Sequence, residues 1–261
     1  MARALHSIVE GIVRPAAFKA AGAAAAAAAM AALTWPGVAL GAGGNAYLDL
    51  SAGYRSGDFG TAVTSDLYDV TPELGYVTPD YNVGVALPLL VLHSEGDGVS
   101  ATDSGIGDLL LRGGARVWRS QDEKTGLNAA VALKLATGDE NKGLGTGATN
   151  YGGFISLNRR VYGNIITLMG GYVVTGSPAG VSYDNVVPYG VSVQRTIGRT
   201  NIYTAVQGQT SAIAGVQDPL EWDLGFFHIL NADYAIKADG FVGLSDGSPA
   251  FGIRSGFVRW F

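Results

Sequence analysis

Apolar and polar residues alternate along the chain from residue 46 to residue 261, and helical periodicity is almost absent there. Alternation at a period of two is typical of β-strands with one apolar face. The alternating segments are about ten residues long and are separated by Gly, Asp, Asn, Pro and Ser. The pattern predicts about twelve strands, at residues 46–55, 69–77, 81–91, 107–119, 126–136, 150–160, 164–174, 186–196, 201–210, 220–230, 234–244 and 250–261.

The two faces of a predicted strand differ sharply in polarity. In the fourth segment the apolar face is Leu109, Leu111, Gly113, Ala115 and Val117, and the polar face is Asp108, Arg112, Arg116 and Trp118. In the last segment one face is Phe251, Ile253, Phe257 and Phe261, and the other is Gly252, Arg254, Gly256 and Val258. Alternation alone fits a soluble β-sandwich as well as a barrel in lipid.

The lengths of the connections separate these two architectures. Short gaps at 78–80, 120–125, 161–163, 197–200 and 231–233 alternate with gaps that are mostly long, at 56–68, 92–106, 137–149, 175–185, 211–219 and 245–249. An up-and-down barrel has short turns at its periplasmic end and longer loops at its extracellular end, whereas Greek-key crossovers do not sort loops by length. The predicted fold class is therefore all-β, a transmembrane up-and-down antiparallel β-barrel of about 12 strands.

Aromatic residues near the predicted strand ends favour the same fold. They lie on the apolar faces, where interfacial girdles form in membrane barrels, and are Tyr76, Tyr151, Tyr172, Tyr189, Trp222, Phe257 and Phe261. Ordinary enrichment of aromatics in strands is the alternative. The chain ends on Phe261, and an exposed aromatic strand of this kind is a sticky edge in a soluble protein. Arg259 is predicted at the periplasmic rim, where its guanidinium reaches water and lipid headgroups.

The N-terminal segment has the features of a secretory signal. Arg3, Arg14 and Lys19 precede an Ala-rich apolar stretch, and small residues at 39–41 follow it. We predict a signal peptide at residues 1–41, cleaved near Gly41 or Ala42, and an outer-membrane β-barrel at residues 42–261. A single membrane anchor is the alternative, but poly-Ala is only marginally apolar.

Charge and composition exclude several functions. Removing residues 1–41 takes away three of 17 basic residues and one of 22 acidic residues, which leaves 14 against 21 and a net charge near −7. An acidic chain does not suit nucleic acid. Without cysteine there is no disulfide framework, and His93 and His228 lack the spacing of metal ligands. We expect no cofactor, no metal and no catalytic residue. A lipid hydrolase needs a Ser in register with His228, and none is present.

Polar residues on the predicted inner faces are the candidates for function. The lumen or pore-lining candidates are Asp49, Asp108, Arg112, Arg116, Lys134, Glu221, Asp223, Lys237, Asp239 and Arg254. The same register points Glu73, Asn128, Asn158, Gln194 and Gln207 inward. We expect Arg112 or Arg116 to pair with an acidic residue, and Lys237 or Arg254 to pair with Glu221 or Asp223. Such networks either fill and rigidify the barrel or line a polar pathway.

Two stretches resemble a known family. They are GIGDLLLRGGAR at residues 105–116 and LKLATGDENKGLGTGATNY at residues 133–151, with Ala136 where the family usually has Pro. They resemble the outer-membrane transporters associated with the meta-pathway of phenol degradation. The resemblance spans roughly residues 70–261 and implies a small barrel that passes hydrophobic or aromatic compounds.

Together these features predict a non-enzymatic, porin-like channel of the bacterial outer membrane for passive passage of small hydrophobic or aromatic molecules. Its expected partners are outer-membrane lipid, a small-molecule solute and the barrel-assembly machinery, which would recognise the C-terminal strand ending at Phe261. We expect extracellular loops such as 137–149 to gate the lumen. A non-transporting structural or adhesion barrel with a filled lumen is the alternative.

Overall fold

The computed structural model describes residues 44–96 and 98–261, so the predicted signal peptide lies outside the described residues. The elements are β1 (Asn45–Gly57), β2 (Thr64–Val77), β3 (Tyr81–Ala86), β4 (Leu89–Gly96), β5 (Val99–Ile106), β6 (Leu109–Arg119), β7 (Thr125–Leu135), the 3₁₀ turn η1 (Glu140–Lys142), β8 (Asn150–Val161), β9 (Asn164–Val174), β10 (Pro188–Ile197), β11 (Thr200–Gln209), β12 (Leu220–Ile229), β13 (Tyr234–Gly243) and β14 (Phe251–Trp260).

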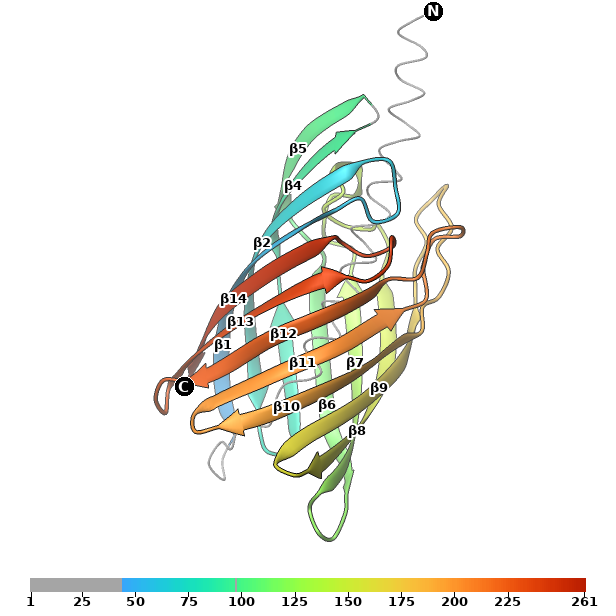
Figure 1. Ribbon diagram of the computed structural model, residues 1–261. Coiled ribbons are helices and arrows are strands. Elements are labelled where there is room, and N and C mark those ends of the chain that lie inside the picture. Colours follow the sequence, from blue (N-terminus) through green and yellow to red (C-terminus); the bar gives the residue numbers. More distant parts are fainter. Residues whose placement is uncertain (1–43, 97) are drawn as a thin grey trace, which may run out of the picture.

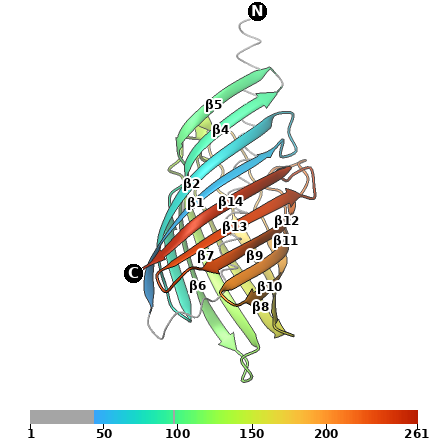
Figure 2. The same ribbon diagram turned by 60° about the vertical axis from the view of Figure 1, so that its left-hand side comes forward.

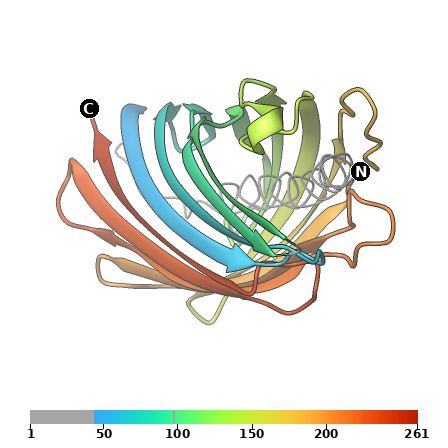
Figure 3. The same cartoon turned by 90° about the horizontal axis from the view of Figure 1, so that it is seen from above.

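These segments form twelve barrel strands, as the sequence predicts. β3 and β4 both pair with β2 and are one strand interrupted at Leu87 and Pro88. β5 and β6 are likewise one strand, interrupted at Gly107 and Asp108. Pro88 has no backbone N–H to donate, and its carbonyl accepts a hydrogen bond from the Gly107 N–H at 2.7 Å. β1 pairs with both β2 and β14, which closes the ring (Figure 3).

Short turns gather at one end of the barrel and longer loops at the other (Figures 1 and 2). We call them the turn end and the loop end; β1 begins and β14 finishes at the turn end. The predicted long connection at 92–106 is wrong, because β4 and β5 continue as a hairpin that projects beyond the loop end. β2 also begins at Thr64 rather than at residue 69, since Thr64–Val70 pair with this hairpin.

The outer face of the barrel is apolar. Leu224 and Ile253 are half-exposed on the outer face, and the seven predicted girdle aromatics are all exposed. Tyr151, Tyr172, Tyr189 and Trp222 lie near the loop end, and Tyr76, Phe257 and Phe261 near the turn end. The two bands match the girdles of a barrel that crosses a bilayer.

The predicted direction of one side chain, that of Trp118, is wrong. A bulge after Arg116 shifts the register of β6, so that Trp118 pairs with Leu127 on the outer face. Trp118 is 52% exposed there, whereas strict alternation predicts it on the polar face. A β-bulge adds one residue to one strand and so reverses the alternation after it.

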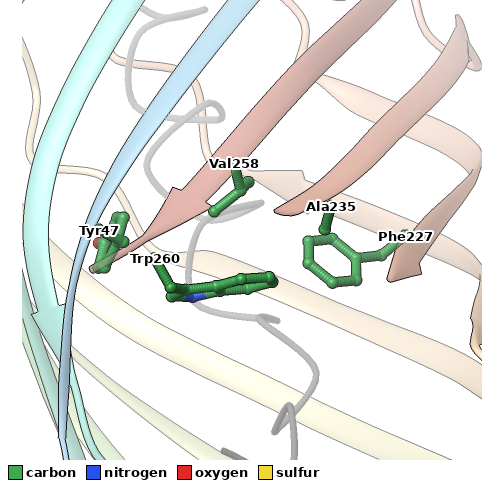
Figure 4. Packing of buried hydrophobic residues seen from close by; sticks show 5 residues of the cluster. All are labelled: Tyr47, Phe227, Ala235, Val258 and Trp260. Carbon is green, nitrogen blue, oxygen red and sulfur yellow. The ribbon is translucent and has the colours of Figure 1, made fainter. Parts of the chain in front are cut away.

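The last strand fits the predicted two faces. Trp260 lies on the opposite face from Phe261 and packs inside the barrel with Tyr47, Phe227, Ala235 and Val258. Figure 4 shows these five side chains, which we call the turn-end cluster. The Arg259 guanidinium lies 4.6 Å from the centre of the Phe261 ring. The last two residues of the chain therefore direct one aromatic ring to the interior, Trp260, and one to the outside, Phe261.

A charge on the outer face tests the membrane orientation of the wall. Ile155 lies near the middle of β8 and is 59% exposed. In phospholipid vesicles, Ile155→Arg is expected to lower the free energy of unfolding by about 2–4 kcal/mol, because Arg is costly at the bilayer midplane. Ile155→Ala is the control for loss of the apolar side chain. Urea denaturation followed by heat-dependent gel mobility measures both, and equal tolerance of Arg and Ala contradicts a lipid-facing position.

Candidate functional site

Five ion pairs line the inner wall of the barrel. Both partners of each pair are mostly buried. The pairs are Arg55–Asp69 at 3.5 Å, Glu73–Arg112 at 2.5 Å, Asp108–Lys134 at 2.6 Å, Asp239–Arg254 at 2.9 Å and Asp49–Lys237. Within these five pairs each buried charge has an opposite partner, which offsets the cost of burying it.

Two of these pairs reach across an intervening strand. Arg112 on β6 donates from Nε and Nη2 to Glu73 on β2, passing over Gly84 of β3. A Cβ at Gly84 would lie 2.7 Å from Glu73 Oε1. Lys237 on β13 reaches Asp49 on β1 over Gly256 of β14, where a Cβ would lie 2.5 Å from Lys237 Cε. Glycine thus provides the room for an ionic contact between second-neighbour strands.

The Glu73 carboxylate also accepts a hydrogen bond from the Tyr47 hydroxyl at 2.5 Å. Tyr47 lies on β1 and crosses Gly75 of β2 to reach it. A Cβ at Gly75 would lie 2.4 Å from Tyr47 Cζ and 2.5 Å from the Val83 carbonyl oxygen. Tyr47, Glu73 and Arg112 therefore connect β1, β2 and β6 from inside the barrel.

Asp108 fastens the loop at residues 136–149 to the barrel wall. Besides Lys134, its carboxylate accepts hydrogen bonds from the backbone N–H of Gly138 at 3.0 Å and of Thr146 at 3.1 Å. Within the same loop, Leu144 is buried against Leu67 and Leu92. Leu67 pairs with Arg55, which belongs to an interior ion pair, so this contact lies on the inner side of the wall. The loop consequently folds inward at the loop end.

The pairing partners differ from those predicted for Lys237 and Arg254. The expected pairing with Glu221 or Asp223 is wrong, because Lys237 bonds Asp49 and Arg254 bonds Asp239. Glu221 and Asp223 both lie buried on the inner face of β12. The Gln207 side chain donates to Asp223 Oδ1 at 3.4 Å.

Arg116 lies apart from the other candidates. Its guanidinium is 3.4 Å from Asp80 at the turn end, and its side chain is about a third exposed. Arg55 and Asp69, absent from the candidate set, form an interior pair. Alternation from Asp49 places Arg55 on the same inner face. Arg55 is, however, the last residue of the predicted strand at 46–55, and the direction of a side chain is poorly predicted at a strand end.

The inner wall has two contrasting sides, which lie opposite each other in the ring of strands. The charged wall is the inner face of β12, β13, β14, β1 and β2, and carries four of the five ion pairs wholly or in part. The apolar wall is the middle of the inner faces of β7, β8 and β9, with Ala130, Ala132, Phe154, Met169 and Val173. The interior is therefore amphipathic.

Two groups in the connections have shifted acidities. In the turn before β7, the Ser120 hydroxyl and the Lys124 N–H donate to Asp122 and lower the pKa of its carboxyl. In the loop before β10, burial raises the pKa of Tyr183, and the nearby Glu140 adds to the effect. Tyr183 packs against the cluster around Phe154. The loops 136–149 and 175–187 therefore approach each other over the loop end.

Within residues 44–96 and 98–261 no three His, Cys, Asp or Glu side chains converge in a way that would hold a metal ion. In the same residues no helix is long and apolar enough to cross a membrane. His228 Nδ1 lies 2.8 Å from the Thr200 hydroxyl near the turn end.

The chain is similar in fold to solved outer-membrane barrels. An outer membrane channel from Pseudomonas putida F1 gives a TM-score of 0.69 at 15% identity, covering 87% of this chain and 99% of that one. The translocator domain of the autotransporter NalP from Neisseria meningitidis gives 0.58 at 14% identity, covering 93% and 97%. No curated protein matches the sequence. At these identities the likeness concerns the fold.

The fold thus defines the class of the protein, a closed twelve-stranded antiparallel β-barrel of the outer-membrane type. The family model described as "Putative MetA-pathway of phenol degradation" matches residues 44–177, just over half of the chain. The chain belongs to this family. The resemblance seen in its glycine-rich stretches is confirmed.

The glycine crossings make a prediction about stability. Gly75→Ala is expected to destabilise the barrel by about 1–3 kcal/mol, because the new methyl group overlaps the Tyr47 ring and the Val83 carbonyl. Gly153→Ala on β8 is the matched control, since a Cβ there meets nothing within 4 Å. Urea unfolding in vesicles compares the two variants. Equal stability would show that Tyr47 moves aside without cost.

Proposed function

We propose that the protein is an outer-membrane channel through which small hydrophobic or aromatic molecules pass passively. The observation that carries this proposal is the amphipathic interior. The apolar wall offers the partly exposed Met169, Ala130 and Ala132 to an apolar solute, and Phe154 and Val173 are buried beside them against Val186 and Ala212. Apolar contact is non-directional and scales with the area removed from water, so it accommodates different solutes without a fitted pocket.

The charged wall supports the same proposal. Its charges are engaged with one another across strands, as in Glu73 with Arg112 and Asp239 with Arg254. Side chains held in this way keep the charged wall rigid. The apolar wall opposite, as defined above, is formed by uncharged side chains. An uncharged solute then moves along the apolar wall without displacing an ion pair.

The turn-end cluster favours a second candidate. Tyr47, Phe227 and Trp260 gather inside the barrel at the turn end, together with Ala235 and Val258 (Figure 4). A lumen filled at this level would make the protein a non-transporting structural or adhesion barrel. Transport measurements decide between the two candidates.

Transport is tested in vesicles whose outer leaflet contains lipopolysaccharide, which slows the passage of hydrophobic solutes through lipid. The protein is expected to accelerate the entry of an uncharged aromatic solute such as benzyl alcohol. Met169→Lys should reduce entry several-fold by placing a charge on the apolar wall, whereas Met169→Leu, similar in volume and polarity, should retain it. If no solute enters and no ions are conducted, the channel proposal is wrong and the non-transporting structural or adhesion barrel is favoured.

Loop 136–149 is proposed to gate the loop end. Asp108→Asn removes the charge that holds Gly138, Thr146 and Lys134, and hydrogen bonds to a charged group contribute about 1.5–3 kcal/mol. We expect a higher mean single-channel conductance in planar bilayers. Asp139→Asn is the matched control, because Asp139 bonds only within the loop, to the Asn141 N–H. Unchanged conductance in Asp108→Asn would contradict a gating role.

A further inference from the structure

The charged wall holds more carboxylates than cations at one level. Asp69, Glu221, Asp223 and Asp239 lie within electrostatic range of one another or of the same two guanidinium groups, those of Arg55 and Arg254. Arg55 is committed to Asp69, and Arg254 to Asp239. Asp223 therefore has no cation of its own in this group.

Asp223 is also short of a hydrogen-bond donor. Its residue is 5% exposed. Gln207 donates to Oδ1 at 3.4 Å, near the limit of a hydrogen bond. Oδ2 is buried and has no hydrogen-bond partner among the described residues. A buried carboxylate oxygen without a donor is costly, so such a group points to a missing ligand.

A hollow in the inner wall lies beside this carboxylate. Its inward-facing lining comes from four neighbouring strands, and includes Met169, Ser192, Tyr203, Gln207 and Asp223. Met169 belongs to the apolar wall and Asp223 to the charged wall. The hollow thus lies over β10 and β11, between the two walls, with the Asp223 acceptor and the Tyr203 ring toward one side and the Met169 thioether toward the other.

We propose that Asp223 and this hollow bind an organic cation, an ammonium group carried on an apolar or aromatic body. The ammonium would donate to Asp223 Oδ2 and bring the positive charge that the cluster lacks. The Tyr203 ring would add cation–π attraction, and Met169 would contact the apolar body. This inference rests on the proposed function, since it names a class of solute that the channel would select.

Binding is tested by calorimetric titration of the detergent-solubilised, folded protein with benzylammonium and with benzyl alcohol, its neutral counterpart. The wild-type protein is expected to bind benzylammonium about tenfold more tightly, because a hydrogen bond to a charged group is the stronger interaction. Equal affinity for the two compounds in the wild-type protein would overturn the proposal without any substitution.

Three variants locate the site. Asp223→Asn should remove the preference for benzylammonium, and Asp223→Glu should keep much of it. Asp122→Asn, which removes a carboxylate from an exposed turn, should leave it unchanged. If Asp223 carries a proton instead, wild type and Asp223→Asn will bind alike, and the proposal fails.

Vesicle entry separates this proposal from the channel function. If benzyl alcohol enters but the protein shows no preference for benzylammonium, the cation site is wrong and the channel stands. If benzylammonium binds through Asp223 but nothing enters, the site stands and the channel is wrong.

Discussion

In lipid, a backbone N–H or C=O group without a partner costs several kcal/mol, and a sheet meets this demand only by closing on itself. The pairing of β1 with both β2 and β14 is that closure. Once the ring is closed, alternation assigns every side chain to lipid or to the interior. Ile253 outside and Arg254 inside are adjacent residues with opposite surroundings.

A second constraint is that the charged side chains inside the narrow barrel need partners of opposite charge. Neighbouring strands supply some partners, as in Asp239 with Arg254. Other partners lie two strands apart and meet over a glycine, as Arg112 meets Glu73 over Gly84. Concentrating the charges on one side leaves Phe154 and Met169 on the other. The lumen is amphipathic because the ion pairs lie on one side of the barrel, and not because the interior has few polar residues.

Periodicity and loop lengths were enough to predict the strands, their number and their faces, because one-sided burial imposes a strong period of two. Local irregularities escaped prediction. The bulge that turns Trp118 outward depends on its pairing with β7, and the part of the β4–β5 hairpin beyond residue 91 carries too few alternating apolar residues to be recognised as strand. Within the site, the inward direction of Asp49 and Lys237 was predictable, but their contact was not. It depends on Gly256, a residue with no side chain to suggest an interaction.

The Asp49–Lys237 pair joins residues separated by 188 positions in the chain. Closing so long a segment carries a large entropic cost, and non-local contacts of this kind form late in folding. A chain that lacks its last strands, or has not yet paired them, leaves Asp49 on an open strand edge without its cation. The pair therefore forms only in a complete barrel. The stability of the junction between the first and last strands thus depends on the whole chain having been synthesised and paired.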